Sequence, residues 1–122
     1  MELHILEPVF SICKLRDLSA ADCSAQFCFL SKTDEEISLV CPSDHAPADA
    51  LERDDGWKGF RIQGVLDFSL VGILAEIAAV LARRQISVFA VSTFNTDYLF
   101  TKAENFANAL TALAAAGYRV AG

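Results

Sequence analysis

Two short polar loops in the second half of the chain carry the side chains best suited to chemistry. The first follows Asp67 and leads into an apolar stripe with helical spacing, and the second covers residues 92–97, after a predicted strand. Backbone N–H groups at a helix start are unpaired and lie at the positive end of the helix dipole, so they can hold a carboxylate. Asp67 or Asp97 can hold an ammonium group. Because a free amino acid carries both charges, we predict that these loops bind one.

The residues around these loops predict the elements that position them. Apolar residues recur at three- and four-residue steps after Asp67, as in a helix packed on a core. They are Leu70, Ile73, Leu74, Ile77 and Leu81. We expect Ser69 to cap this helix. A branched and aromatic run over residues 86–94 predicts a strand buried on both faces, and residues 98–103 predict another strand after a polar turn.

The remaining pattern adds strands and a second helix. Strands are predicted over residues 3–15 with a kink at Pro8, and over 25–31, 36–41, 57–66 and 118–120. Residues 42–56 predict a loop with a short helix near 48–52, and the charge run over 52–55 indicates a solvated surface. A helix is predicted over residues 104–116, with Gly117 as its C-terminal cap.

The element order predicts an α+β fold. From residue 57 onward it is strand, helix, two strands, helix, strand, which is the ferredoxin-like plan of an antiparallel sheet with helices on one face. An internal duplication is also visible, because Phe10-Ser-Ile12 parallels Phe60-Arg-Ile62 and residues 31–40 parallel residues 92–101. We therefore predict two related units, a degenerate one over residues 1–56 and a complete one over residues 57–122.

Composition argues against several classes of protein. The net charge of −6, with no basic cluster larger than Arg83-Arg84, argues against nucleic acid as a partner. The apolar run over residues 68–81 is shorter than the ~20 residues needed to cross a bilayer, so no membrane partner is expected. The N-terminus lacks the basic region of a secretory signal, and we expect a cytoplasmic protein.

Catalytic, metal and cofactor sites are not expected either. No nucleophile and base pair or phosphate-binding loop stands out, and both histidines are isolated in the sequence. The four cysteines form no Cys-x-x-Cys pair, which favours reduced structural thiols over a zinc site. They are Cys13, Cys23, Cys28 and Cys41.

The segment over residues 64–99, with Asp-Phe-Ser-Leu-Val-Gly at its helix start and Ser-Thr-Phe-Asn-Thr-Asp after its strand, resembles ACT domains, the small regulatory modules that bind amino acids. The whole chain resembles short bacterial proteins made of two ACT-like units, which are related to the CASTOR-type arginine sensors of animal cells. The resemblance implies a ligand at the interface of ACT units, between the loop at the helix start and neighbouring strands.

The resemblance also implies which residues bind the ligand. At the helix start these are Asp67, Phe68, Ser69, Leu70, Val71 and Gly72, and after the strand they are Ser92, Thr93, Phe94, Thr96 and Asp97. In the arginine sensors the acidic residue faces a cationic side chain, which implies Arg or Lys as the ligand. The Asp-x-Pro-Gly segment of many metabolic ACT domains is absent, which argues against transfer from members that bind serine or phenylalanine.

Structural explanations stand beside these ligand roles. Gly72 also suits close helix packing, Ser69 a plain N-cap, and Asp97 an acidic turn. Two hypotheses follow. The first is a non-enzymatic amino-acid sensor that forms a homodimer or docks on a regulated protein partner. The alternative is a structural oligomerisation module that uses an exposed sheet edge or helix face and has a vestigial pocket.

Overall fold

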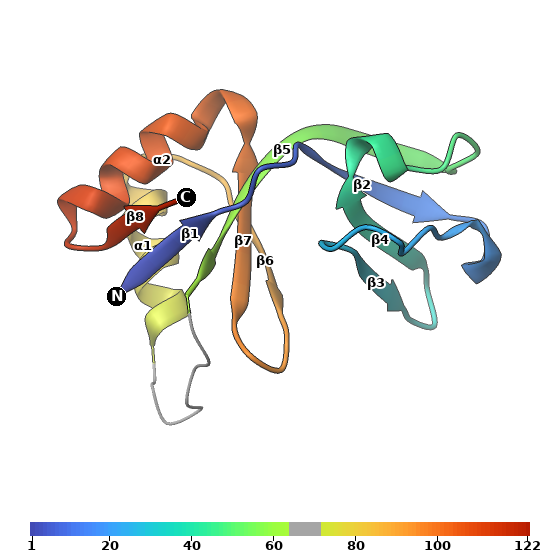
Figure 1. The fold of residues 1–122 in the computed structure, drawn as a ribbon, viewed down its shortest axis with the longest axis horizontal. Coiled ribbons are helices and arrows are strands. Elements are labelled where there is room, and N and C mark those ends of the chain that lie inside the picture. The colour runs from blue at the N-terminus through green and yellow to red at the C-terminus, as the bar shows by residue number, and fades with distance from the viewer. Residues whose placement is uncertain (64–71) are drawn as a thin grey trace. The chain divides into compact units, whose positions relative to one another are not determined.

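The structure is a computed structural model that describes residues 1–63 and 72–122. By its internal contacts the chain divides into two compact units. Unit 1 combines Met1–Glu7 with Lys58–Gly122, and unit 2 is Pro8–Trp57. Strand β5, Glu52–Ile62, contributes residues to both units (Figure 1). The boundary predicted after residue 56 lies close to this division, although Met1–Glu7 belongs to unit 1 and not to the N-terminal unit in which it was placed.

Unit 1 contains a five-stranded arrangement to which the end of β5 belongs. Its other strands are β1 (Glu2–Ile5), β6 (Phe89–Ser92), β7 (Asp97–Lys102) and β8 (Arg119–Ala121). β7 pairs with β6 and β5, and β1 lies between β5 and β8. The sheet was predicted to be antiparallel. β1 is antiparallel to β5, as predicted, but it is parallel to β8. The N-terminal strand thus separates the first and last strands of the predicted βαββαβ order.

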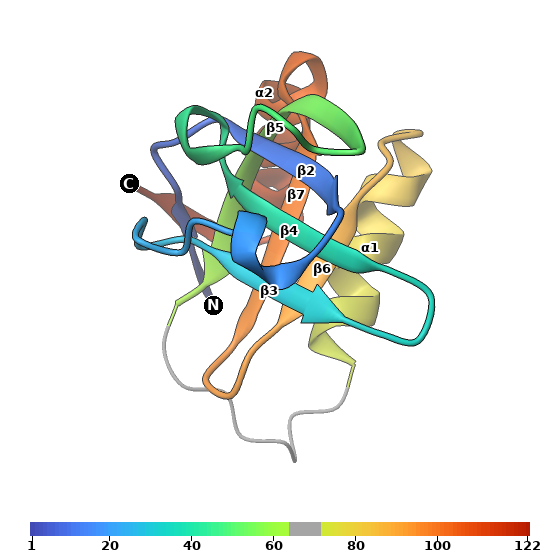
Figure 2. The same cartoon turned by 90° about the vertical axis from the view of Figure 1, so that its right-hand side faces the viewer.

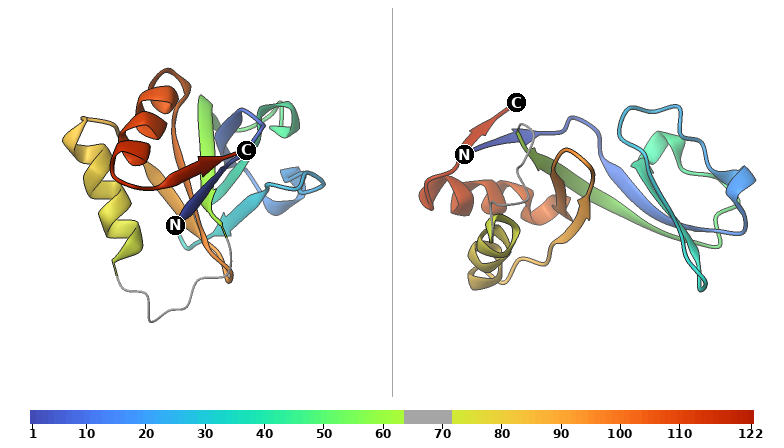
Figure 3. Two further views of the ribbon diagram at one scale, coloured as in Figure 1. Left: turned by 60° about the vertical axis from the view of Figure 1, so that its left-hand side comes forward. Right: turned by 90° about the horizontal axis from the view of Figure 1, so that it is seen from below.

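Two helices, α1 (Ile73–Arg83) and α2 (Ala103–Ala115), lie on one side of the unit 1 sheet (Figure 3, left). Their buried residues pack against those of β1, β5 and β7. The core includes Leu3, Phe60, Ile62, Leu99, Ile77, Leu81, Phe106 and Leu113. The predicted α+β fold class is therefore confirmed, as is the predicted stripe of α1 from Ile73 to Leu81, whereas Leu70 lies outside the described residues. None of the helices in the described ranges is long and apolar enough to span a membrane.

The start of α1 and the end of α2 each have a glycine with a positive φ. α1 begins at Ile73, and Gly72, whose φ of 89° is accessible to glycine at little cost, occupies its N-cap position. Ser69, the predicted N-cap, lies outside the described residues. Gly117, with a φ of 103°, follows the last turn of α2, as predicted from its C-cap pattern. β6 alternates between half-buried and exposed residues, so the prediction of a strand buried on both faces is wrong.

Unit 2 is a smaller, nearly all-strand unit (Figure 2). Its strands are β2 (Phe10–Leu15), β3 (Phe29–Lys32), β4 (Ile37–Pro42) and the start of β5, in the order β3-β4-β2-β5 with antiparallel neighbours. Short 3-10 turns, η1 (Leu18–Ala20) and η2 (Ser43–His45), follow β2 and β4. A small core contains Cys13, Leu15, Leu39 and Cys41.

Two details of unit 2 differ from the sequence analysis. The strand predicted over residues 3–15 is interrupted around Pro8, and its two parts, β1 and β2, belong to different units. The helix expected near residues 48–52 is absent from this described segment. Instead, the 3-10 turn lies at Ser43–His45 and the charge run begins strand β5. The charged residues of this run are exposed, as predicted. Their strand conformation was not predicted.

The β3–β4 and β6–β7 hairpins have matching geometry. Lys32 pairs with Ile37 at the end of the first hairpin, and Ser92 pairs with Asp97 at the end of the second. In both turns the N–H of the threonine after the first strand donates to a backbone carbonyl three residues later at 2.9 Å. In the structure, Lys32 therefore corresponds to Ser92. The match of residues 31–40 with 92–101 in the sequence placed Ser31 on Ser92, so it differs from the structural match by one residue.

Candidate ligand-binding site

The β6–β7 turn holds an acidic side chain at the mouth of the hairpin. Ser92 and Asp97 are paired across the two strands, and Ser92 Oγ donates a hydrogen bond to Asp97 Oδ1 at 2.6 Å. Asp97 is half-buried, and it forms no ion pair with any described residue. A neutral hydroxyl fixes this carboxylate while leaving its charge uncompensated. The group is therefore suited to accept an ammonium or guanidinium group.

Thr96 connects this turn to the strand that precedes the α1 region. Its side chain is 6% exposed, and its Oγ1 donates to the backbone oxygen of Ile62 at 2.7 Å. Ile62 is the last residue of β5. Because the hydroxyl is buried and already bonded to the backbone, Thr96 is arranged to position the turn.

Of the other predicted residues in this turn, Thr93 helps to close the turn and Phe94 is exposed to solvent. Thr93 Oγ1 donates to the backbone oxygen of Thr96 at 2.9 Å, which adds to the bond made by its own N–H. Phe94 is 86% exposed at the tip of the turn. The structure thus gathers Ser92, Thr93, Thr96 and Asp97 in one hydrogen-bonded turn, whereas the Phe94 ring is left in solvent.

The predicted helix-start loop is described only at its last residue. Asp67, Phe68, Ser69, Leu70 and Val71 lie outside the described residues. A Cβ built on Gly72 would meet no atom within 4 Å, so close helix packing does not require glycine at this position. Its positive φ does favour glycine, so the backbone conformation gives Gly72 a structural use that the sequence pattern did not indicate.

A cavity in unit 1 contains a hydrogen-bonded pair that the sequence analysis missed. It has a volume of about 260 Å³ and is lined by Met1, Ile73, Glu76, Ala116, Gly117 and Tyr118. Tyr118 Oη donates to Glu76 Oε1 at 2.6 Å. Burial, followed by this bond and the charge of Glu76, raises the pKa of Tyr118 to about 12. Glu76 is exposed on α1, and no local signal in the sequence links it to a tyrosine beyond α2.

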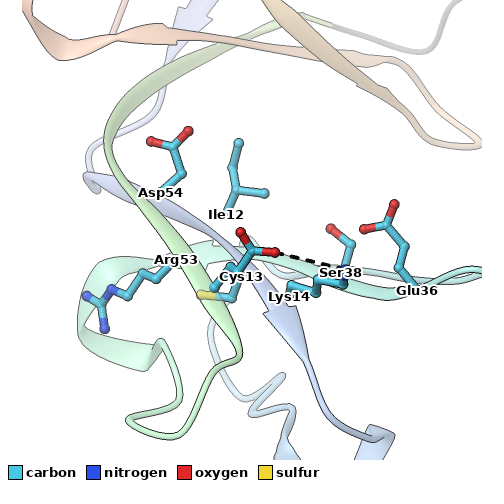
Figure 4. A pocket seen from close by; sticks show the side chains of 8 residues that line it. Ile12, Cys13, Lys14, Glu36, Ser38, Arg53 and Asp54 are labelled. Atoms are coloured by element: carbon cyan, nitrogen blue, oxygen red, sulfur yellow. Dashed lines mark ion pairs between the residues drawn. The ribbon is translucent and has the colours of Figure 1, made fainter.

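A second cavity, of about 340 Å³, lies along the unit 2 sheet (Figure 4). It is lined by Ile12, Cys13, Lys14, Glu36, Ser38, Glu52, Arg53 and Asp54. Lys14 Nζ lies 3.9 Å from Glu52 Oε2, and the Arg53 Nε donates to Asp55 Oδ1 at 2.6 Å. The basic groups at this cavity are thus already engaged with carboxylates, and its lining is acidic overall.

The cysteines all belong to unit 2 and all four are free thiols. Burial is the main cause that raises the pKa of Cys41 to about 12, with the neighbouring Cys13 contributing. Cys23 is exposed. Within the described ranges, no group of three or more His, Cys, Asp or Glu residues is arranged to hold a metal ion.

Comparison with known proteins identifies relatives of both the sequence and the fold. The profile of the ACT domain matches residues 52–115. A protein of Agobacterium tumefaciens solved by structural genomics is 31% identical, with a TM-score of 0.88 over 99% of this chain and 92% of that chain. A Vibrio cholerae protein of unknown function, described as a possible transport protein, is 21% identical, with a TM-score of 0.74 over 92% and 86% of the two chains.

Aspartate kinase of Clostridium acetobutylicum, described as an allosteric enzyme, shares the fold at 11% identity. The TM-score is 0.60, over 91% of this chain and 33% of the kinase. No curated protein matches the chain.

Proposed function

Because the chain belongs to the ACT-domain family, we propose that it is a non-enzymatic regulatory protein that binds a free amino acid. The observation that carries this proposal is the uncompensated carboxylate of Asp97, held by Ser92 at the mouth of a hairpin that Thr96 ties to the end of β5. A carboxylate fixed in this way offers a charge-assisted bond to a ligand cation. Arg and Lys are the proposed ligands, because each carries a second cationic group besides its α-ammonium.

The helix-start residues 67–72 complete the proposed site. Free N–H groups at the start of α1 are suited to the ligand carboxylate, at the opposite end of the ligand from the group on Asp97. Ser92, Thr93 and Phe94 are proposed to line the site, and Thr96 to position it. A ligand that bridges the two loops would stabilise whichever arrangement of ACT units holds them together, and this is the basis of the proposed regulation.

The tandem arrangement is part of the same proposal. In unit 2, strand order β5-β2-β4-β3 follows the ferredoxin-like plan, and the turns η1 and η2 lie where that plan has helices. The matching hairpins further support descent of unit 2 from an ACT-like unit that lost its helices. We therefore assign unit 2 as the degenerate member of a pair, with β1 completing the sheet of unit 1.

A charge-neutral substitution tests the proposed site. Asp97→Asn keeps the size of the side chain and an oxygen that can accept the bond from Ser92, but it removes the charge. We expect the affinity for Arg or Lys to fall at least tenfold, as measured by calorimetric titration. Asp34→Asn, in the corresponding hairpin of unit 2, is the matched control and should retain wild-type affinity. Equal affinities of the two variants would remove Asp97 from the site.

Oligomerisation without a ligand is the second candidate function. It is favoured by β6, an edge strand with an open side in the described part of unit 1, followed directly by the exposed ring of Phe94. We propose a homodimer in either case. Calorimetric titration distinguishes the two functions, because a module that only oligomerises binds no amino acid at millimolar concentration. Light scattering with and without amino acids tests the homodimer itself.

A further inference from the structure

The cavity at the start of α1 presents a negative charge that no described residue neutralises. Glu76 is exposed on α1, and no ammonium or guanidinium group in the described chain, the Met1 amino group included, forms an ion pair with it. Arg119 is the basic residue next to Tyr118, and its Nε lies 3.3 Å from Glu2 Oε2. The basic residue next to Tyr118 in the sequence is therefore already paired with Glu2.

Tyr118 fixes the direction of this carboxylate. Its side chain is 8% exposed and belongs to the core of unit 1, so the ring position is set by packing. The hydroxyl donates to one carboxylate oxygen of Glu76, Oε1, and the raised pKa keeps it a neutral donor over the physiological range. A carboxylate that is oriented in advance loses less side-chain entropy when it binds a ligand.

The rest of the cavity is small and mostly apolar. Ile73, Met1 and Ala116 provide aliphatic surface, and Gly117 has no side chain. The volume of about 260 Å³ is below the roughly 300–1,000 Å³ of sites for drug-sized ligands, which limits the occupant to a small molecule. Glu76 is the one carboxylate among these lining residues, and its full negative charge exceeds the roughly half a unit of positive charge at the start of α1. The other formal charge at the cavity is the Met1 amino group, which forms no ion pair with Glu76 in the described chain.

We propose that this cavity, the Glu76–Tyr118 pocket, binds a small primary amine with a short aliphatic chain. The ammonium group donates to the carboxylate of Glu76, and the aliphatic chain lies against Ile73 and Ala116. The pocket shares no residue with the hairpin turn around Asp97, but it lies at the start of α1, next to Gly72 of the proposed amino-acid site. The inference does not depend on amino-acid binding at that site.

The test uses n-butylamine and n-butanol as matched probes, because they have similar size but only the amine is charged at pH 7. Each is titrated into the isotopically labelled full chain, and amide chemical shifts are followed by NMR. We expect n-butylamine to give saturable shifts at residues 73–76 and 116–118, and n-butanol to bind at least tenfold more weakly. Equal responses to the two probes, or no saturable shift with the amine, would overturn the proposal.

Three variants make the assignment specific. Glu76→Gln should weaken n-butylamine binding at least tenfold, and Tyr118→Phe should weaken it several-fold because the carboxylate is no longer oriented. Asp34→Asn, a substitution in unit 2, should leave the shifts at residues 73–76 and 116–118 unchanged. Unaltered binding by folded Glu76→Gln protein would refute the pocket.

Discussion

The hydroxyl of Thr96 offers a direct test of how the hairpin turn is held in place. Thr96→Val replaces the hydroxyl with a methyl group of similar size, so no cavity is created. The backbone oxygen of Ile62 loses the donor that lies 2.7 Å from it. Because Thr96 is 6% exposed, water has little access to replace that donor. An acceptor left unpaired in such a place costs about 1–3 kcal/mol, and we expect the free energy of unfolding to fall by that amount.

The assay is urea unfolding with the slope of the transition held in common between variants. Thr111→Val is the matched control, because Thr111 Oγ1 donates to the backbone oxygen of Ala107 at 3.0 Å on the exposed surface of α2. Water replaces that donor, so the control should remain within about 0.5 kcal/mol of wild type. If Thr96→Val is no less stable than Thr111→Val, the Thr96 bond does not hold the turn.

Three further outcomes follow from packing and pKa values in the structure. Gly59→Ala should destabilise unit 1 by about 1–3 kcal/mol in the same urea assay, because its Cβ would lie 2.7 Å from two ring atoms of Phe100, and the smaller Phe100→Leu should restore part of the loss. The pKa of Tyr118 is raised to about 12 from an ordinary value of 10.0, so the folded state keeps this proton longer. Stability should therefore fall between pH 10 and 12, and urea unfolding of Tyr118→Phe should lack that part of the decline. In the folded protein a thiol reagent should modify the exposed Cys23 first and the buried Cys41 only on unfolding, as mass spectrometry would show.

Local patterns in the sequence predicted the helices and hairpins well. The helix predicted over residues 104–116 matches α2, and the polar residues around Thr93 located the turn between β6 and β7. These features depend on periodicity and turn chemistry within a few residues of each other, which a single sequence displays directly.

Features that depend on distant pairing were not predictable in the same way. Leu3 pairs with Ile62 in unit 1, and nothing in the local pattern of residues 3–15 distinguishes that partner from one in unit 2. The pairing of Lys14 with Glu52 in a sheet similarly converts a charge run into a strand. Backbone hydrogen bonding to β2 decides the conformation of that run, although its side chains remain in solvent.

The same difference between local patterns and contacts of distant residues applies to the candidate site. Asp97 was predicted because a carboxylate in a turn is visible in the sequence and because the segment resembles ACT domains. The position of Thr96 under the turn, and the bond from Tyr118 to Glu76, join residues from separate elements. Only the fold brings these groups together, so the sequence identified a candidate ligand group more readily than the residues that orient it.

Thermal unfolding in the presence of each of the twenty amino acids tests the proposed function most directly. A ligand at 100 times its dissociation constant adds about 2.7 kcal/mol to the free energy of unfolding, which is a readily measured rise in the midpoint. We predict a selective rise with Arg or Lys for the wild-type protein and for Asp34→Asn, and a much smaller rise for Asp97→Asn. A flat response of the wild-type protein to all twenty amino acids, each at millimolar concentration, would contradict amino-acid sensing.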